Sequence, residues 1–103
     1  MQTTLKKRLE IVIEAPMLER LMRKLDTLEL PGYTVMPAVS GRGRNGSWSR
    51  KGEISDSQRM FVLFAILDES LLSDVLDAVY KLVSAQIGIV TVSDVHVIRA
   101  DHF

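Results

Sequence analysis

The stretch MFVLFAILDESLLSDVLDAVYKLV, residues 60–83, contains the two patterns that decide the fold class. Its first eight residues, 60–67, are all apolar, and a short run of this kind between polar segments is typical of a buried strand. The remainder has the spacing of an amphipathic helix, with apolar residues at Leu71, Leu72, Val75, Leu76, Val79, Leu82 and Val83. Asp68 or Ser70 is placed to cap this helix, so the Asp68-Glu69 carboxylate pair is interpreted as capping rather than acid–base chemistry.

A second strand and helix precede this unit. In residues 9–14 (LEIVIE) the apolar Leu9, Ile11 and Ile13 alternate with other positions, which predicts a half-buried strand. Pro16 suits the first turn of a helix. Apolar residues then recur at helical spacing until Pro31-Gly32 ends the run. The chain therefore repeats a strand-and-helix unit.

Two further extended segments complete the pattern. Residues 33–40 predict a strand in which Pro37 cannot donate to a neighbour, so this strand should lie where one N–H faces away from the sheet. Residues 87–99 (IGIVTVSDVHVIR) are rich in β-branched side chains and predict the last strand, with a possible kink at Ser93-Asp94.

The resulting order is βαββαβ, which favours the α+β class and a ferredoxin-like sandwich: an antiparallel sheet with two helices on one face. The other face would then be bare. Apolar side chains such as Met60, Val62 and Phe64 on that face need cover. A closed cyclic assembly would supply it.

Composition limits the possible functions. The 103 residues fit a single domain, 1–103, and the 13 basic and 13 acidic residues cancel, so we expect no general attraction to nucleic acid or membrane. No apolar run approaches the roughly 18 residues of a membrane span, and no cysteine is present. We therefore expect a soluble, cytoplasmic protein without membrane insertion.

The chemistry is concentrated in a long loop that starts at Gly41. Residues 41–57 hold four of the six glycines and four serines, which predicts a mobile segment. Residues 41–46 (GRGRNG) match a dinucleotide-binding pattern, but no helix follows, and Ser47-Trp48 replace the residues that a P-loop needs. What remains is a nest of backbone N–H groups beside Arg42, Arg44, Arg50 and Lys51, suited to phosphate or carboxylate. The alternative is a solvated basic hairpin tip.

Candidate catalytic groups are few. No Ser/His/Asp or Cys/His set is visible, and His96 and His102 lack a carboxylate cluster for a metal. We therefore expect a protein that is not an enzyme and holds no metal, although a slow nucleotide hydrolase that uses the loop arginines stays open. Trp48, an aromatic residue among small polar ones, is either a partner anchor or locally packed.

Four short features carry a family resemblance: a first strand that ends just before Pro16, the segment 32–35 (GYTV), the pair Gly41 and Gly43 at the start of the loop, and a terminal Val97-Ile98-Arg99. In this order they resemble the PII signalling family, in particular its PII-like branch tied to inorganic-carbon uptake and carboxysomes. The resemblance implies a homotrimer with an adenine nucleotide between neighbouring subunits. It also implies that residues 41–58 are the projecting loop that this family calls the T-loop.

The resemblance also implies roles for single residues. Those expected near the nucleotide are Ile13, Gly41, Arg42, Gly43, Arg44, Ile87, Gly88, Ile89 and, from the adjacent chain, Arg99. Arg59 takes the place of an effector-binding lysine and, with Gly41, would bind a small anion such as bicarbonate. Trp48 and Arg50 would contact a protein target through the loop, such as a bicarbonate transporter or a carboxysome component.

Departures from the family pattern refine the ligand. The phosphate-gripping loop after the second helix is reduced to residues 84–88 (SAQIG), and Asp101 stands where the family has a second arginine. The resemblance therefore implies ADP or AMP rather than ATP. The loop has no tyrosine for uridylylation. A trimeric ferredoxin-like protein of the divalent-cation tolerance type, without nucleotide binding, is the alternative.

Overall fold

The computed structural model describes residues 1–43, 46–49, 59–84 and 88–99. The predicted mobility of the loop falls largely on residues outside these ranges. The elements, in chain order, are β1 (Thr4–Glu14), α1 (Ala15–Thr27), β2 (Thr34–Pro37), β3 (Ser40–Gly43), β4 (Gly46–Ser49), β5 (Met60–Leu67), α2 (Glu69–Val83) and β6 (Gly88–Val97).

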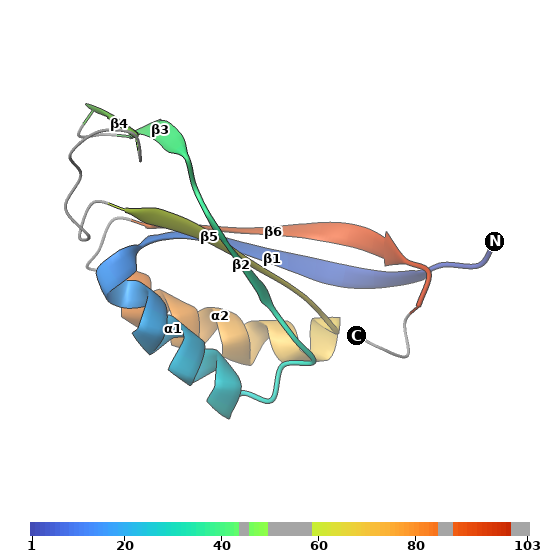
Figure 1. Ribbon diagram of the computed structural model, residues 1–103. Coiled ribbons are helices and arrows are strands. Elements are labelled where there is room, and N and C mark those ends of the chain that lie inside the picture. Colours follow the sequence, from blue (N-terminus) through green and yellow to red (C-terminus); the bar gives the residue numbers. More distant parts are fainter. Residues whose placement is uncertain (44–45, 50–58, 85–87, 100–103) are drawn as a thin grey trace.

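Four of the strands form one antiparallel sheet in the order β2-β5-β1-β6. Both helices cover the same face of this sheet (Figure 1). The predicted ferredoxin-like fold is thereby confirmed. β2 lies at an edge of the sheet, as the missing N–H of Pro37 requires.

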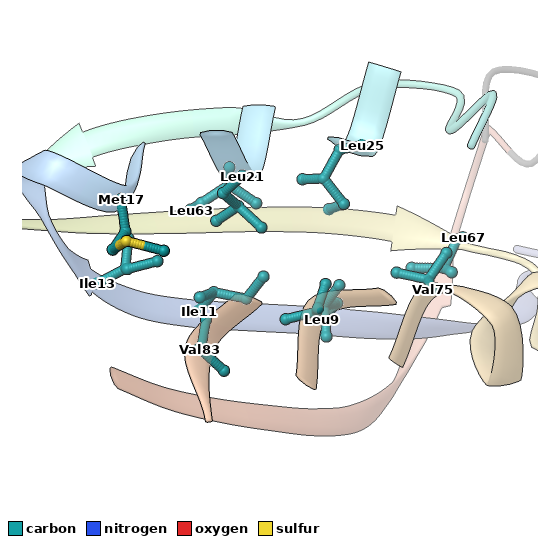
Figure 2. Close-up of a cluster of buried hydrophobic side chains, with 12 residues drawn as sticks. Leu9, Ile11, Ile13, Met17, Leu21, Leu25, Leu63, Leu67, Val75 and Val83 are labelled. Atoms are coloured by element: carbon teal, nitrogen blue, oxygen red, sulfur yellow. The ribbon is translucent and has the colours of Figure 1, made fainter. Parts of the chain in front are cut away.

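The core lies between the sheet and the helices because alternate strand residues point to the same face. Leu9, Ile11 and Ile13 of β1 are fully buried in the cluster that both helices share. Figure 2 shows Leu21 of α1 beside Leu63 of β5, and Ile11 near Val83 of α2. Each helix therefore packs on the central strands through its apolar face.

β1 is longer than the sequence predicts, whereas β6 (Gly88–Val97) is shorter than the predicted strand 87–99 but regular. β1 begins at Thr4 instead of residue 9, and its ladder with β6 runs unbroken from Thr4↔Val97 to Ile13↔Gly88. The expected kink at Ser93-Asp94 is therefore wrong. Asp94 lies opposite Lys7, whose Nζ donates to Asp94 Oδ1 at 2.5 Å, so charge pairing across the ladder keeps this stretch regular.

The expected side-chain cap of α2 is also wrong. Asp68 occupies the N-cap position, but its carboxylate makes no capping hydrogen bond. It accepts instead from Nζ of Lys6 on β1. A carboxylate held by a lysine ties the start of α2 to the sheet, and Glu69 in the first turn remains favourably placed for the helix dipole.

Part of the segment that the sequence predicts as irregular forms a hairpin. β3 and β4 pair antiparallel, with Gly41 opposite Trp48 and Gly43 opposite Gly46. Gly and Ser fill most positions of both strands (SGRG and GSWS), so no repeated hydrophobic position marks a strand period in the sequence. In Figure 1 the hairpin lies beyond one end of the main sheet, away from the helices.

The sheet face opposite the helices is bare, as predicted, although the prediction is wrong for Met60, which is only 9% exposed and buried. Val62 and Phe64 on this face are half-buried, and the guanidinium of Arg8 lies 5.0 Å from the centre of the Phe64 ring. Arg8 also donates to Glu10 Oε2 at 2.7 Å. In the part of the chain that the structure describes, none of the helices is both long and apolar enough to cross a bilayer.

Candidate functional site

Apart from Arg99, the predicted nucleotide residues that the structure describes lie at one end of the sheet, where β1 ends and β5 and β6 begin. Ile13 pairs with Gly88 on one side and with Phe61 on the other. The N–H of Ala15 donates to the carbonyl of Arg59 at 2.9 Å, which joins the first turn of α1 to the start of β5. Figure 1 shows the β3–β4 hairpin at the same end.

A main-chain hydrogen bond also fixes the segment that leads from β2 to this end of the sheet. The N–H of Ala38 donates to the carbonyl of Met60 at 3.0 Å. Gly41 and Arg42 of β3 follow a few residues later. Gly41 is half-buried and Arg42 is exposed, so an arginine and a glycine-rich backbone stand at the same end of the sheet as Arg59.

Ile13 and Gly88 differ in their surroundings at this end of the sheet. Ile13 as a whole residue is 0% exposed and belongs to the core, so in the single chain neither its side chain nor its backbone is open to a nucleotide. A Cβ at Gly88 would lie 3.2 Å from the carbonyl oxygen of Val12, which is tighter than an ordinary contact. Glycine therefore permits β6 to approach β1 closely at the start of its ladder, and Ile89, the next residue, is 62% exposed.

Arg99 lies at the opposite end of the sheet in the same chain. It follows Val97, which pairs with Thr4, while the other candidates cluster around the first residue of β6. At about 3.3 Å per strand residue, the length of β6 separates the two ends by roughly 30 Å. A site that combines Arg99 with Gly88 therefore needs two copies of the chain, as the resemblance implies.

Several candidates fall outside the described residues. Arg44, Arg50 and Ile87 belong to this group, and for Trp48 the structure describes only the backbone, in β4. Their roles stay predictions. Among the residues that are described, no group of three or more His, Cys, Asp or Glu side chains gathers to hold a metal ion.

Two hollows of the described surface lie along α1 instead of at the sheet end. One has a volume of about 270 Å³ and is lined by Arg20, Arg23, Lys24, Thr27 and Leu82. The other, of about 320 Å³, is lined by Glu19, Met22, Arg23, Asp26 and Tyr33. The sequence predicted no role for these side chains. The sequence pattern that could have indicated the first hollow is basic: Arg23 and Lys24 follow Arg20 by three and four residues, a spacing that places all three on one helix face.

Tyr33 is the anchor of the second hollow. Its hydroxyl donates to Asp26 Oδ1 at 3.0 Å, which ties the start of β2 to the last turn of α1. Burial raises the pKa of Tyr33 above its ordinary value, and the hydrogen bond to Asp26 adds to this effect. The neutral phenol is thus the form that the fold favours.

An antiparallel βαββαβ sheet, with a glycine-rich hairpin between β2 and β5, defines a ferredoxin-like protein. The sequence matches the family model described as nitrogen regulatory protein P-II over residues 6–102. The chain therefore belongs to the P-II family. A search of curated proteins found no match.

Solved structures agree with this family. CPII, a nitrogen regulatory PII-like protein from Thiomonas intermedia K12 bound to ADP, AMP and bicarbonate, is 26% identical, with a TM-score of 0.87 over 99% of this chain and 96% of CPII. A structure of CPII bound to ADP, AMP and acetate is 25% identical, with a TM-score of 0.81 over 100% of this chain and 98% of that one. A DUF3240 family protein from Shewanella baltica OS155, 14% identical, shares the fold with a TM-score of 0.67 over 89% of each chain.

Proposed function

We propose that this chain is a PII-like sensor that binds ADP or AMP between subunits of a homotrimer and couples that binding to bicarbonate. The observation that carries the proposal is the match to CPII, which extends over nearly the whole of both chains and whose structures contain ADP, AMP and bicarbonate. The matching family model is described as a nitrogen regulatory protein, so the proposed output is a change in the surface offered to a protein partner.

The distribution of the candidate residues supports a site between subunits. Gly88, Arg59 and Gly41 lie at one end of the sheet, whereas Arg99 follows the far end of β6. Arg99 of one subunit would supply a planar, bidentate donor to the nucleotide phosphate in the cleft of its neighbour. The bare sheet face gives the subunits of the proposed trimer a partly apolar surface on which to associate.

The short connection after α2 supports a preference for ADP or AMP. α2 ends at Val83 and β6 begins at Gly88, so the segment that replaces the phosphate-gripping loop is limited to residues 84–88. A longer glycine-rich loop would present more N–H groups to a third phosphate. The site is therefore suited to nucleotides that carry one or two phosphates.

Arg59 is the proposed anion-binding residue. Its carbonyl is held by Ala15, immediately before β5, so its side chain starts from a fixed point near the base of the hairpin. A guanidinium matches a small planar anion through two parallel hydrogen bonds. Bicarbonate bound there would link the nucleotide site to residues 41–58, through which Trp48 and Arg50 would contact a bicarbonate transporter or a carboxysome component.

Calorimetric titration with ADP tests the shared site. We expect wild-type protein to bind ADP in the micromolar range and Arg99→Ala to weaken binding by about tenfold or more, because a charge-assisted bond is lost. Lys81→Ala, which removes an exposed cation of α2, is the matched control and should bind as wild type. Equal affinity of Arg99→Ala and wild type would refute the role of Arg99. The absence of any ADP binding would favour a protein of the divalent-cation tolerance type.

Mixed trimers test whether the site is shared. Arg99→Ala subunits are combined with subunits that carry Gly88→Val, which places a bulky side chain against the Val12 carbonyl. In a mixed trimer some clefts join an intact Arg99 to an intact Gly88, so ADP binding should return after co-refolding. Binding that stays lost in the mixture would place both residues in the same subunit's site and contradict the proposal.

A further inference from the structure

The groove between α1 and α2 has a chemical character that the proposed nucleotide site does not use. Its volume is about 270 Å³, and four of its five lining residues come from α1. Leu82 of α2 forms the apolar part. The groove belongs to the helix layer, on the side of the sheet opposite the bare face (Figure 1). It is therefore on a different surface from that proposed for subunit association.

Positive charge is concentrated on this side of α1. Arg20, Arg23 and Lys24 are separated by three and four residues and all are exposed, so they share one helix face. Among the described residues, the ion pair that involves this trio joins Arg23 to Glu19 at 3.8 Å, with side chains 70% and 82% exposed. An exposed pair of this kind contributes little energy, so Arg23 can exchange Glu19 for another carboxylate at little cost.

Negative charge is concentrated on the other flank of the same helix. Glu19 and Asp26 line the second hollow together with Tyr33, and Asp26 is fixed there by the Tyr33 hydroxyl. The chain has no net charge, so the separation along α1 is local. Lys24 in the last turn of α1 interacts favourably with the helix dipole. Arg20 and Arg23 add positive charge that this interaction does not explain.

We propose that this groove docks an acidic segment of a partner protein, with carboxylates on Arg20, Arg23 and Lys24 and an apolar side chain on Leu82. Guanidinium groups hold carboxylates through paired hydrogen bonds. Three cations are fewer than the phosphate contacts of a typical nucleic-acid interface, and the groove is smaller than the roughly 300–1,000 Å³ of small-molecule sites. The inference does not depend on nucleotide binding.

The test uses a short fluorescein-labelled peptide of glutamate pairs separated by leucine, with binding followed by fluorescence anisotropy on the full chain. We expect weak binding that declines with added salt, because exposed charges are screened. Arg20→Glu combined with Lys24→Glu should weaken binding by about tenfold or more, since attraction becomes repulsion. Arg20→Lys combined with Lys24→Arg keeps both charges and should retain binding.

Control variants separate binding in the groove from a general effect of charge. Lys81→Glu reverses an exposed cation that does not line the groove and should leave peptide binding within about twofold of wild type. Thermal unfolding and ADP titration check that each variant is folded. If charge reversal unfolds the protein, Arg20→Gln with Lys24→Gln replaces it. Three results would each overturn the proposal. The first is unchanged peptide affinity after charge reversal or neutralisation of Arg20 and Lys24. The others are equal binding of a lysine–leucine peptide and binding of anionic vesicles in the absence of the peptide.

Discussion

The ion pair between Lys6 and Asp68 allows a stability prediction with a defined sign. Lys6 is only 9% exposed, and Asp68, which accepts its hydrogen bond, is 56% exposed. Asp68→Asn removes the charge that pairs with a nearly buried ammonium group. It removes no side-chain cap of α2, because the carboxylate makes none, and Asn is as good as Asp at that position.

The magnitude follows from the exposure of the two partners. A hydrogen bond to a charged group contributes about 1.5–3 kcal/mol. Solvent at the half-exposed carboxylate reduces this value, so Asp68→Asn should lower the free energy of unfolding by about 1–2 kcal/mol. In a domain of this size each kcal/mol corresponds to about 4–8 °C in Tm.

Urea and thermal unfolding at matched protein concentrations provide the assay. Lys6→Met combined with Asp68→Asn should be more stable than Asp68→Asn alone, because the unpaired ammonium is also removed. Asp94→Asn breaks the neighbouring pair with Lys7 and should cost less than Asp68→Asn, because Lys7 is 21% exposed and Lys6 only 9%, while the two carboxylates are similarly exposed. A loss at Asp68 no greater than at Asp94, or a double variant weaker than Asp68→Asn, would refute the reasoning.

Two further predictions concern Tyr33 and Gly88. In a Tyr80→Phe background Tyr33 is the remaining tyrosine, and its absorbance at alkaline pH should give a Tyr33 pKa above the ordinary 10.0. Asp26→Asn should lower the pKa of Tyr33, because the hydrogen bond to the carboxylate contributes to the shift. An unchanged pKa in Asp26→Asn would contradict that contribution. Because the folded-state pKa is raised, the contribution of Tyr33 to stability is present below about pH 10 and is lost as the pH rises through the folded value. Gly88→Ala should destabilise the protein by about 1 kcal/mol, because its Cβ would lie 3.2 Å from the fixed Val12 carbonyl; unfolding at the wild-type urea midpoint would show that β6 can shift.

The element order could be predicted from the sequence because hydrophobic periodicity is a local signal. The strand at residues 60–67 agrees with β5, and the stripe through Val75 and Val79 agrees with α2. The first part of β1 could not be predicted in this way. Lys6 and Lys7 break the hydrophobic pattern, and their strand conformation depends on Asp68 and Asp94, which are distant in the sequence.

The candidate site was predictable in composition but not in geometry. The glycines and arginines after residue 40 indicate anion binding by their chemistry. The placement of Gly41 and Arg42 at the same end of the sheet as Gly88 and Arg59 depends on the antiparallel register, which no local pattern contains. The basic face of α1 was visible in the spacing of its three cations, but the Leu82 wall of the groove comes from the packing of α2.

Paired calorimetric titrations give the sharpest test of a nucleotide site that is coupled to an anion. ADP is titrated with and without bicarbonate, and bicarbonate with and without ADP, on wild type and Arg59→Ala. We predict that each ligand changes the affinity of the other by the same factor, about five- to 150-fold, and that Arg59→Ala abolishes this change while ADP still binds. Wild-type ADP affinity that is identical with and without bicarbonate would contradict the coupling, and no detectable ADP binding would contradict the sensor itself.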